Sequence, residues 1–371
     1  MRTDARCAGI LPEDAHLRTK AAHRGVYLAL MCYRQEILRA LDPSFRTPLV
    51  TNAAIARRAG VASIYVKVES ARPFGNFKVL GGLPAALNAL ARWAGVSVKH
   101  LLEEPRDHGE LPMLICASDG NHGLAVAAAA LAAGARATIV LHRAIDAVRV
   151  KRICALGADI VFVDGSYDDA VDHAAALARS GRGLLVADTT DRADDPVVGD
   201  VMRGYGRIAD EIASQLAEAG GPAPTHLFVQ AGVGGLAAIM AERLYEHLRA
   251  PRRIVVVEPS AAACVGHALS TGRIERIDGN LRTAAEMLSC GVASVPAIAI
   301  LRRRRAQSAI VSEAQMARAV AILEADVGLR STASGAAGLA GLLSASASST
   351  ERSRLALDAS SVPMLIVTER G

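Results

Sequence analysis

One lysine carries the first chemical signal in this chain. Lysine occupies only positions 20, 67, 78, 99 and 151 among 42 Lys and Arg residues, so arginine supplies most of the positive charge. Lys78 follows the segment R-P-F-G-N-F and precedes V-L-G-G. A desolvated lysine loses its proton readily and its amine can attack a carbonyl, whereas a guanidinium stays charged. Lys78 is therefore a candidate for imine formation, and a solvated lysine at the start of a helix is the alternative.

A second polar segment, S-D-G-N-H-G at 118–123, follows an apolar run and precedes an alanine-rich one. This order places Asp119 and Asn121 between the carboxyl end of a strand and the amino end of a helix, where ligands collect. The helix dipole and the first helical amides favour anions there, which would keep Asp119 ionised as a base. Ordinary N-cap chemistry is the alternative. His122 has no sequence partner at metal-ligand spacing, so a metal site is not expected.

The third segment is glycine-rich and reads Q-A-G-V-G-G-L at 230–236. Glycines leave room for a phosphate to approach backbone N–H groups at a helix start. The amides that could surround a phosphate are those of Gly232, Val233, Gly234, Gly235 and Leu236. The same stretch fits a dinucleotide pattern, with Glu258 at the end of the next strand as the ribose-binding acid. A tight strand-to-helix turn without a ligand is the third interpretation.

Pyridoxal phosphate is the cofactor that needs both an imine-forming lysine and a phosphate site at a helix start. NAD would explain the glycines but would give Lys78 no role. Two further polar pairs, Asp188-Thr189 and Thr368-Glu369, also follow predicted strands and could lie near the same ligand.

The elements that position these segments follow a βα pattern in two series. From residue 111, β-branched runs alternate with alanine-rich helical stretches, which is typical of a parallel sheet covered by helices. The first series has predicted strands at 113–116, 137–141, 160–163 and 184–186, with helices at 122–133, 146–156 and 167–179. The second has helices at 200–218, 236–248, 313–325 and from Gly335, strands at 227–229, 254–257, 309–311 and 364–367, and a serine-rich connector at 344–353. Segment 45–70 is expected to join the second series, so the first forms a small inserted domain.

Composition restricts the class of protein. The chain has 371 residues, 51% of them hydrophobic, which suffices for two moderate cores. Its six cysteines form no C-x-x-C pair, and its longest apolar run, 124–135, is shorter than the ~20 residues of a spanning helix. A soluble, cytoplasmic protein is expected, without a signal peptide or a membrane association. The run Arg302–Arg305 lacks interleaved aromatics, which make up only 3% of the chain, so nucleic-acid binding is not expected.

Taken together, these motifs resemble the fold-type II pyridoxal-phosphate enzymes, and most of all their diaminopropionate ammonia-lyase branch. The similarity includes Arg72, the frame around Lys78, the segment 118–123 with its aspartate, and A-G-V-G-G at 231–235. It covers roughly residues 45 to 371. The resemblance implies an α/β fold like that of the tryptophan synthase β subunit, with two doubly wound parallel-sheet domains and the active site between them. The implied domains are 1–85 with 189–371, which would bind the cofactor, and a small inserted 86–188; the implied assembly is a homodimer.

The resemblance also implies roles for single residues. Lys78 would bond the cofactor aldehyde next to Phe77, Asn121 would contact the phenolic oxygen, and Thr368 would approach the ring nitrogen as a neutral partner. The glycine segment from Gly232 to Leu236 would hold the phosphate. Lys78 would remove the Cα proton of an L-substrate and Asp119 that of a D-substrate. The residues that would bind substrate are Asp119, Asp188, Thr189 and Ser334.

Several positions depart from the branch pattern. Thr190-Asp-Arg-Ala193 replaces an aromatic, acidic loop, Ala333 stands where an acidic residue is expected, and Arg370 replaces a glycine. The expected reaction is α,β-elimination from 2,3-diaminopropionate to pyruvate and ammonia. A serine/threonine dehydratase or a β-replacement synthase is the alternative, and an NAD-dependent oxidoreductase or a catalytically silent homologue is a more remote one.

Overall fold

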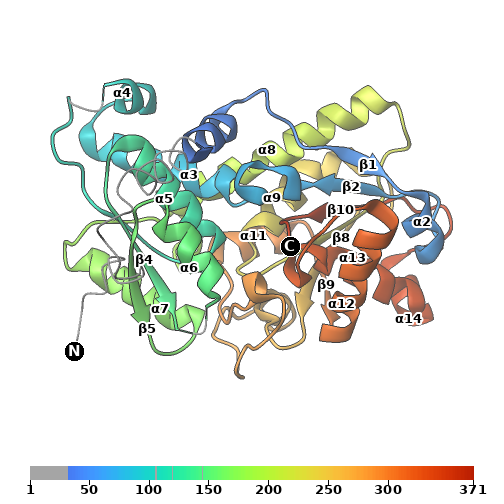
Figure 1. Cartoon of the computed structure of the whole chain (residues 1–371). Coiled ribbons are helices and arrows are strands. Elements are labelled where there is room, and N and C mark those ends of the chain that lie inside the picture. Colours follow the sequence, from blue (N-terminus) through green and yellow to red (C-terminus); the bar gives the residue numbers. More distant parts are fainter. Residues whose placement is uncertain (1–31, 105–106, 119, 144) are drawn as a thin grey trace, which may run out of the picture. The chain divides into compact units, whose positions relative to one another are not determined.

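A computed structural model of the chain describes residues 32–104, 107–118, 120–143 and 145–371 (Figure 1). Contacts divide the chain into two compact units. The first unit comprises residues 1–45 and 78–187, and the second comprises 46–77 and 188–371. The contacts thus group Lys78 with the first unit. The domain boundaries expected from the sequence, 1–85 with 189–371 and 86–188, stay a prediction.

The first unit contains a four-stranded parallel sheet in the order β5-β4-β3-β6. Its strands are β3 (Leu114–Ala117), β4 (Ala137–His142), β5 (Asp159–Val163) and β6 (Leu184–Leu185). Every residue of β3 and nearly every residue of β4 is buried, as expected for a parallel sheet with both faces covered. All four strands predicted in this region are confirmed to within two residues.

Helices cover both faces of this sheet. Besides helical residues 32–41, the described part of the unit includes the helices α3 (Val79–Ala94), α4 (Val98–Glu103), α5 (Asn121–Ala133), α6 (Ala147–Cys154) and α7 (Tyr167–Arg179). Helix α7 packs with Val140, whereas Gly123 of α5 lies against Ile139. Adjacent strand residues point to opposite faces, so α5 and α7 lie on opposite sides of the sheet. The three helices predicted between these strands are thus confirmed as α5, α6 and α7, and the span of α7 is the predicted one.

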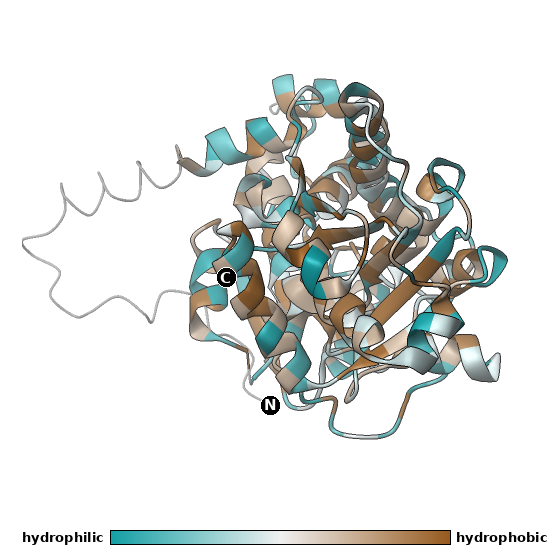
Figure 2. Cartoon of the chain, turned by 90° about the vertical axis from the view of Figure 1, so that its right-hand side faces the viewer, coloured by the Kyte–Doolittle hydropathy of each residue, from teal (hydrophilic) through white to brown (hydrophobic). Residues whose placement is uncertain are grey.

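The second unit contains a six-stranded sheet in the order β1-β2-β10-β7-β8-β9, parallel except for β1 (Figure 1). The strands are β1 (Leu49–Thr51), β2 (Tyr65–Val68), β7 (His226–Gln230), β8 (Arg253–Pro259), β9 (Gln307–Val311) and β10 (Pro363–Val367). Strand β2 pairs with β10, which confirms that segment 45–70 joins the second series. Figure 2 shows most of the strand ribbon at the hydrophobic end of the colour scale.

Several helices pack around this second sheet. Helices α2 (Ala53–Ala59), α12 (Glu313–Ile322) and α13 (Ala333–Ala347) share a core with Phe228, Val255 and Val257. Helix α9 (Gly235–Leu244) packs against α8 (Pro196–Ala219) and α11 (Val295–Arg303). Helix α10 (Cys264–Thr271) follows β8 and packs against β8 and β9. None of the helices in the described ranges is long and apolar enough to cross a membrane.

The serine-rich segment 344–353 was wrongly predicted to be a connector. The structure continues α13 to Ala347 and starts α14 (Ser349–Leu355) directly afterwards. Ser348 is the N-cap of α14, and its side chain accepts from the amide of Glu351. Serine is a preferred N-cap residue, and Ala345 is buried against the core, so capping and packing outweigh the low complexity of the sequence.

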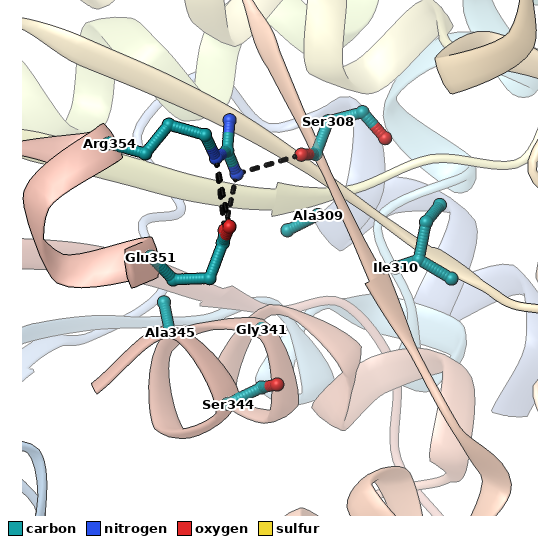
Figure 3. Close-up of a pocket in the computed structure, with 8 residues that line it drawn as sticks. All are labelled: Ser308, Ala309, Ile310, Gly341, Ser344, Ala345, Glu351 and Arg354. Atoms are coloured by element: carbon teal, nitrogen blue, oxygen red, sulfur yellow. Dashed lines mark hydrogen bonds and ion pairs between the residues drawn. The ribbon is translucent and has the colours of Figure 1, made fainter. Parts of the chain in front are cut away.

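The edge strand β9 borders a hollow of about 380 Å³ (Figure 3). Arg354 pairs with Glu351 there and donates from Nη2 to the carbonyl oxygen of Ser308 at 3.1 Å. This contact occupies one backbone acceptor of the edge strand. Free backbone groups on an edge strand can pair with a strand of another chain. We interpret the ion pair as a cover for this edge.

Candidate active site

In the first unit, Lys78 lies at the amino end of α3. Its carbonyl oxygen accepts from the amides of Gly81 and Gly82, at 3.1 and 2.9 Å. A Cβ atom on Gly82 would lie 2.8 Å from Cβ of Ala125 and 3.0 Å from Nδ1 of His122, so only glycine allows α3 and α5 to approach this closely. Gly82 and His122 both belong to the first turn of their helices. The amino ends of α3 and α5 therefore meet, and Lys78 and Asn121 belong to these two ends.

The segment before α5 combines cap chemistry with packing. The hydroxyl oxygen of Ser118 accepts from the amides of Gly120 and Gly123, at 2.9 and 2.7 Å, so this serine caps the helix. His122 is buried, and its Nε2 lies 2.8 Å from the carbonyl oxygen of Val186. His122 therefore packs within the unit, as expected for a histidine at a helix start. Asp119 lies outside the described residues.

In the second unit, the glycine segment connects β7 to α9. Gly234 has a φ of +99°, which side chains rarely tolerate. A Cβ atom on Gly232 would lie 3.0 Å from Sγ of Cys290 and 3.1 Å from the carbonyl oxygen of Met287. Residues 287–290 therefore pack tightly against the glycine segment. The first amides of a helix have no acceptor within it. The segment from Gly232 to Leu236 thus includes the start of α9 and glycines in close packing, and its role as a phosphate site stays a prediction.

Gln230 is a residue whose importance the sequence interpretation missed. Its Nε2 lies 3.0 Å from Oγ1 of Thr368 and 3.1 Å from each of three carbonyl oxygens, those of Ser334, Gly335 and Ile366. Because three of the neighbours are carbonyl acceptors, the amide nitrogen must face them, and Oγ1 of Thr368 accepts a hydrogen bond from it. Oε1 of Gln230 is buried and has no hydrogen-bond partner among the described residues. In the sequence, the signal that could have identified Gln230 is its position at a predicted strand end, next to the glycine segment.

Gln230 thus joins two predicted site residues, Thr368 and Ser334, at the carboxyl ends of β7 and β10. Phe77 lies beside them, since its amide donates to the carbonyl oxygen of Thr368 at 3.1 Å and its ring lies 4.9 Å from that of Tyr205. The Ser334 hydroxyl accepts from the amide of Met287 at 3.1 Å. The second unit therefore brings together Phe77, Thr368 and Ser334.

Two residues predicted to bind substrate, Asp188 and Thr189, lie at the start of segment 188–371 of the second unit. Asp188 is buried and Thr189 is half-buried. The next residue, Thr190, accepts at its carbonyl oxygen from the amide of Val295 at 3.0 Å, which ties this segment to α11. The roles of Asp188 and Thr189 in substrate binding stay predictions.

Glu258 contradicts the dinucleotide interpretation. It is fully buried at the end of β8, and its two carboxyl oxygens accept from the amides of Val265 and Gly266, at 2.8 and 2.7 Å. Burial raises the pKa of Glu258 to about 8, although both amides act in the opposite direction. An acid committed to the backbone of α10 is not available to a ribose. The glycine segment therefore has no ribose-binding acid at this position.

A buried ionic cluster lies just before Lys78 in sequence, within the second unit. Arg72 Nη2 lies 2.7 Å from Oε1 of Glu69 and 2.8 Å from Oε2 of Glu211, and Lys67 Nζ lies 2.7 Å from the same Glu211 oxygen. Burial favours the neutral form of Glu211, but hydrogen bonds and charge from Arg72 and Lys67 lower its pKa to about 2. Burial lowers the pKa of Lys67. The cluster holds the segment from Glu69 to Phe77 against α8.

Comparison with known proteins identifies the family of the chain. A family model described as pyridoxal-phosphate dependent enzyme matches residues 41–358. The chain is 32% identical to the diaminopropionate ammonia-lyase of Escherichia coli K12, over 87% of this chain and 84% of that enzyme. For the enzyme of the same name from Salmonella typhimurium, the identity is 32% over 69% of this chain and 66% of the enzyme. The human L-serine dehydratase/L-threonine deaminase is 26% identical, over 74% and 75% of the two chains.

The fold agrees as well. The crystal structure of holo diaminopropionate ammonia lyase from Escherichia coli matches with a TM-score of 0.78 and 29% identity, over 92% of this chain and 88% of that one. The family model, the relatives and the solved structure thus agree on the cofactor family and on an α/β fold with two parallel-rich sheets. The chain therefore belongs to the fold-type II family of pyridoxal-phosphate-dependent enzymes.

Proposed function

We propose that this enzyme eliminates ammonia from 2,3-diaminopropionate, consuming one water and giving one pyruvate and two ammonia molecules. The observation that carries the proposal is the hydrogen bond from Gln230 to Thr368. Because the Thr368 oxygen accepts from Gln230, its own proton remains to be donated to another group. The similarity to two diaminopropionate ammonia-lyases supports this choice of substrate.

The residues of each unit fit pyridoxal phosphate. In the second unit, the amides from Gly232 to Leu236 would hold the phosphate, because the glycines leave room and α9 begins there. Thr368 would donate to the ring nitrogen, and a neutral donor leaves this nitrogen without an added proton. In the first unit, Lys78 would bond the cofactor and Asn121 would contact the phenolic oxygen.

Bound pyridoxal phosphate supplies an aldehyde that condenses with amines and a ring that accepts electron density from the adjacent carbon. The protein's part is to orient the substrate and to move protons. The Lys78 amine would take the Cα proton of an L-substrate. Asp119 takes this proton from a D-substrate. The proton is then available to the β-amino group, which leaves as ammonia when its bond to Cβ breaks.

A dehydratase acting on serine or threonine is the second candidate, supported by the human relative. The changed segment 190–193 also favours a substrate different from that of the ammonia-lyases. In the structure the Thr190 hydroxyl accepts from the amide of Arg192 at 3.1 Å, so a local turn replaces the aromatic loop expected of the branch.

The test is a substrate panel with pyruvate and ammonia measured separately. L- and D-2,3-diaminopropionate, L-serine and L-threonine are incubated with the wild type and with Asp119→Asn. We expect diaminopropionate to be consumed fastest, with two ammonia molecules per pyruvate, and the variant to lose activity on the D-isomer alone. Faster turnover of serine would replace the proposal by the dehydratase. A cofactor-loaded protein that releases neither product would identify a silent homologue.

Gln230→Leu tests the supporting hydrogen bond. The variant keeps the approximate volume but removes every donor, so Thr368 is free to rotate and three buried carbonyl groups lose a partner. We expect kcat to fall about five-fold, because one hydrogen bond of about 1 kcal/mol is lost. The measurement is steady-state kinetics on the preferred substrate, together with urea unfolding to record the loss of stability. Gln315→Leu is the control, because Gln315 caps α12 and donates to Ser344. Unchanged kcat in Gln230→Leu would remove the support that Thr368 gives to the proposal.

A further inference from the structure

Glu258 is a buried acid that the proposed reaction does not use. Both of its carboxyl oxygens are bound to the first turn of α10, through the amides of Val265 and Gly266. A Cβ atom on Gly266 would lie 3.0 Å from Oε2 of Glu258 and 2.5 Å from Oγ of Ser308. Position 266 therefore needs a glycine for the acid to reach the helix. A side chain that accepts two amides with its two carboxyl oxygens holds the first turn of a helix in place, because these amides have no acceptor within the helix.

The same turn of α10 touches the glycine segment. Sγ of Cys264 donates to the carbonyl oxygen of Gly232 at 3.4 Å. A Cβ atom on Gly234 would lie 3.2 Å from Cγ2 of Val265, so the valine side chain packs directly behind this glycine. Cys264 and Val265 are both buried. One side of the glycine segment is therefore formed by residues whose backbone Glu258 holds.

The other contacts of the segment do not depend on Glu258. Ser294 donates from its amide to the carbonyl oxygen of Val233 at 2.9 Å, and Cys290 lies behind Gly232. The segment is thus held from two directions, by α10 and by residues 290–294. Loss of one support should loosen the segment without unfolding the sheet.

We propose that Glu258 is a positioning residue for the phosphate site: by fixing the first turn of α10, it holds Cys264 and Val265 against Gly232 and Gly234. This inference rests on the proposed placement of the cofactor phosphate at Gly232 to Leu236. Glu258 itself contacts neither cofactor nor substrate. Its effect is on the position of backbone amides, whose hydrogen bonds to a phosphate depend steeply on geometry.

Glutamine is the informative replacement, because it has the shape of glutamate but only one acceptor oxygen. In Glu258→Gln, an amide NH₂ faces either the Val265 or the Gly266 N–H, so one of two hydrogen bonds becomes a contact between donors. The first turn of α10 must shift or lose a bond. A change confined to this turn is expected to affect the phosphate and not the ring of the cofactor.

The experiment compares two ligands that differ only in the phosphate. Full-length wild type and Glu258→Gln, freed of cofactor, are titrated with pyridoxal phosphate and with pyridoxal, and binding is followed by absorbance. We expect the variant to bind pyridoxal phosphate about ten-fold more weakly, the equivalent of about 1.4 kcal/mol, with pyridoxal affinity nearly unchanged. The ³¹P resonance of the loaded variant should shift or broaden. Glu351→Gln, at an exposed ion pair of the same unit, is the control and should match the wild type.

The outcomes separate this inference from the proposed phosphate site. If wild type binds both ligands equally, the phosphate is not held at Gly232 to Leu236, and the site assignment fails. If wild type prefers the phosphate form and Glu258→Gln keeps the full preference with an unchanged ³¹P signal, only the role of Glu258 is wrong. Should Glu258→Gln fail to fold, Val265→Ala removes the packing behind Gly234, and a full preference in that variant would equally overturn the inference.

Discussion

Alanine in place of Lys78 is expected to abolish turnover, with kcat reduced on the order of 10⁴-fold or more, as for removal of a covalent catalyst. In the proposed mechanism, the side chain would supply both the amine that bonds the cofactor and the base for the Cα proton, so no second group could replace both functions. The fold should persist, because Lys78 begins α3 and its carbonyl oxygen, not its side chain, bonds Gly81 and Gly82. The measurement is pyruvate release, together with circular dichroism of the variant.

Two further variants define what Lys78 contributes. Lys78→Arg retains the charge but cannot lose its proton, and we expect it to be as inactive as the alanine variant. Lys99→Ala changes an exposed lysine of the same unit and should leave activity unchanged. Borohydride should attach the cofactor to the Lys78 peptide in the wild type and to no peptide in Lys78→Ala. Attachment elsewhere in the wild type would show that another lysine is the catalytic one.

Arg72→Met is expected to produce the largest loss of stability. The guanidinium is buried and bonds both Glu69 and Glu211. Its removal takes this cation from both carboxylates, while Glu211 keeps Lys67 and Arg207. Breaking a buried ion pair from one side costs about 3–5 kcal/mol of unfolding free energy. Urea unfolding of the second unit measures this loss. Because the cluster holds the segment that leads into Phe77 and Lys78, the affinity for the cofactor should fall as well.

The control for Arg72 is an ion pair at the surface of the same unit. Arg46 lies 2.6 Å from Glu218 with both side chains about half exposed, and Arg46→Met should cost less than about 1 kcal/mol. If both variants lost the same unfolding free energy, the buried cluster would stabilise the protein no more than a surface ion pair.

The cluster also predicts a pH dependence. The pKa of Glu211 is lowered from 4.5 to about 2 in the folded protein, so its ionised form stabilises the fold above pH 4.5. This contribution is lost as the pH falls from 4.5 towards 2, because the unfolded chain then binds the proton first. In Arg72→Met, which removes the strongest partner of Glu211, the decrease in stability over this range should be shallower.

The sequence by itself determined the chemistry of the candidate site. A single lysine framed by glycines and aromatics, and a glycine run after an apolar strand, are local features whose meaning depends on side-chain type and backbone freedom. The strands of both sheets could be predicted for the same reason, since a buried parallel strand is a short β-branched run with polar or glycine ends. These properties lie within a few neighbouring residues.

The tertiary structure decided which of these residues support one another. Gln230 and Thr368 are 138 residues apart, and Arg72 and Glu211 are 139 apart, so no local pattern records either contact. Glu258 was interpreted as a ribose-binding acid because its place at a strand end fits that role, but its oxygens bind the backbone of α10. Segment 344–353 is serine-rich, as linkers between elements often are. It nevertheless forms parts of α13 and α14, because helix capping and burial stabilise the helical backbone. A hydrogen bond or an ion pair depends on distance in space, which the order of residues fixes only after the chain has folded.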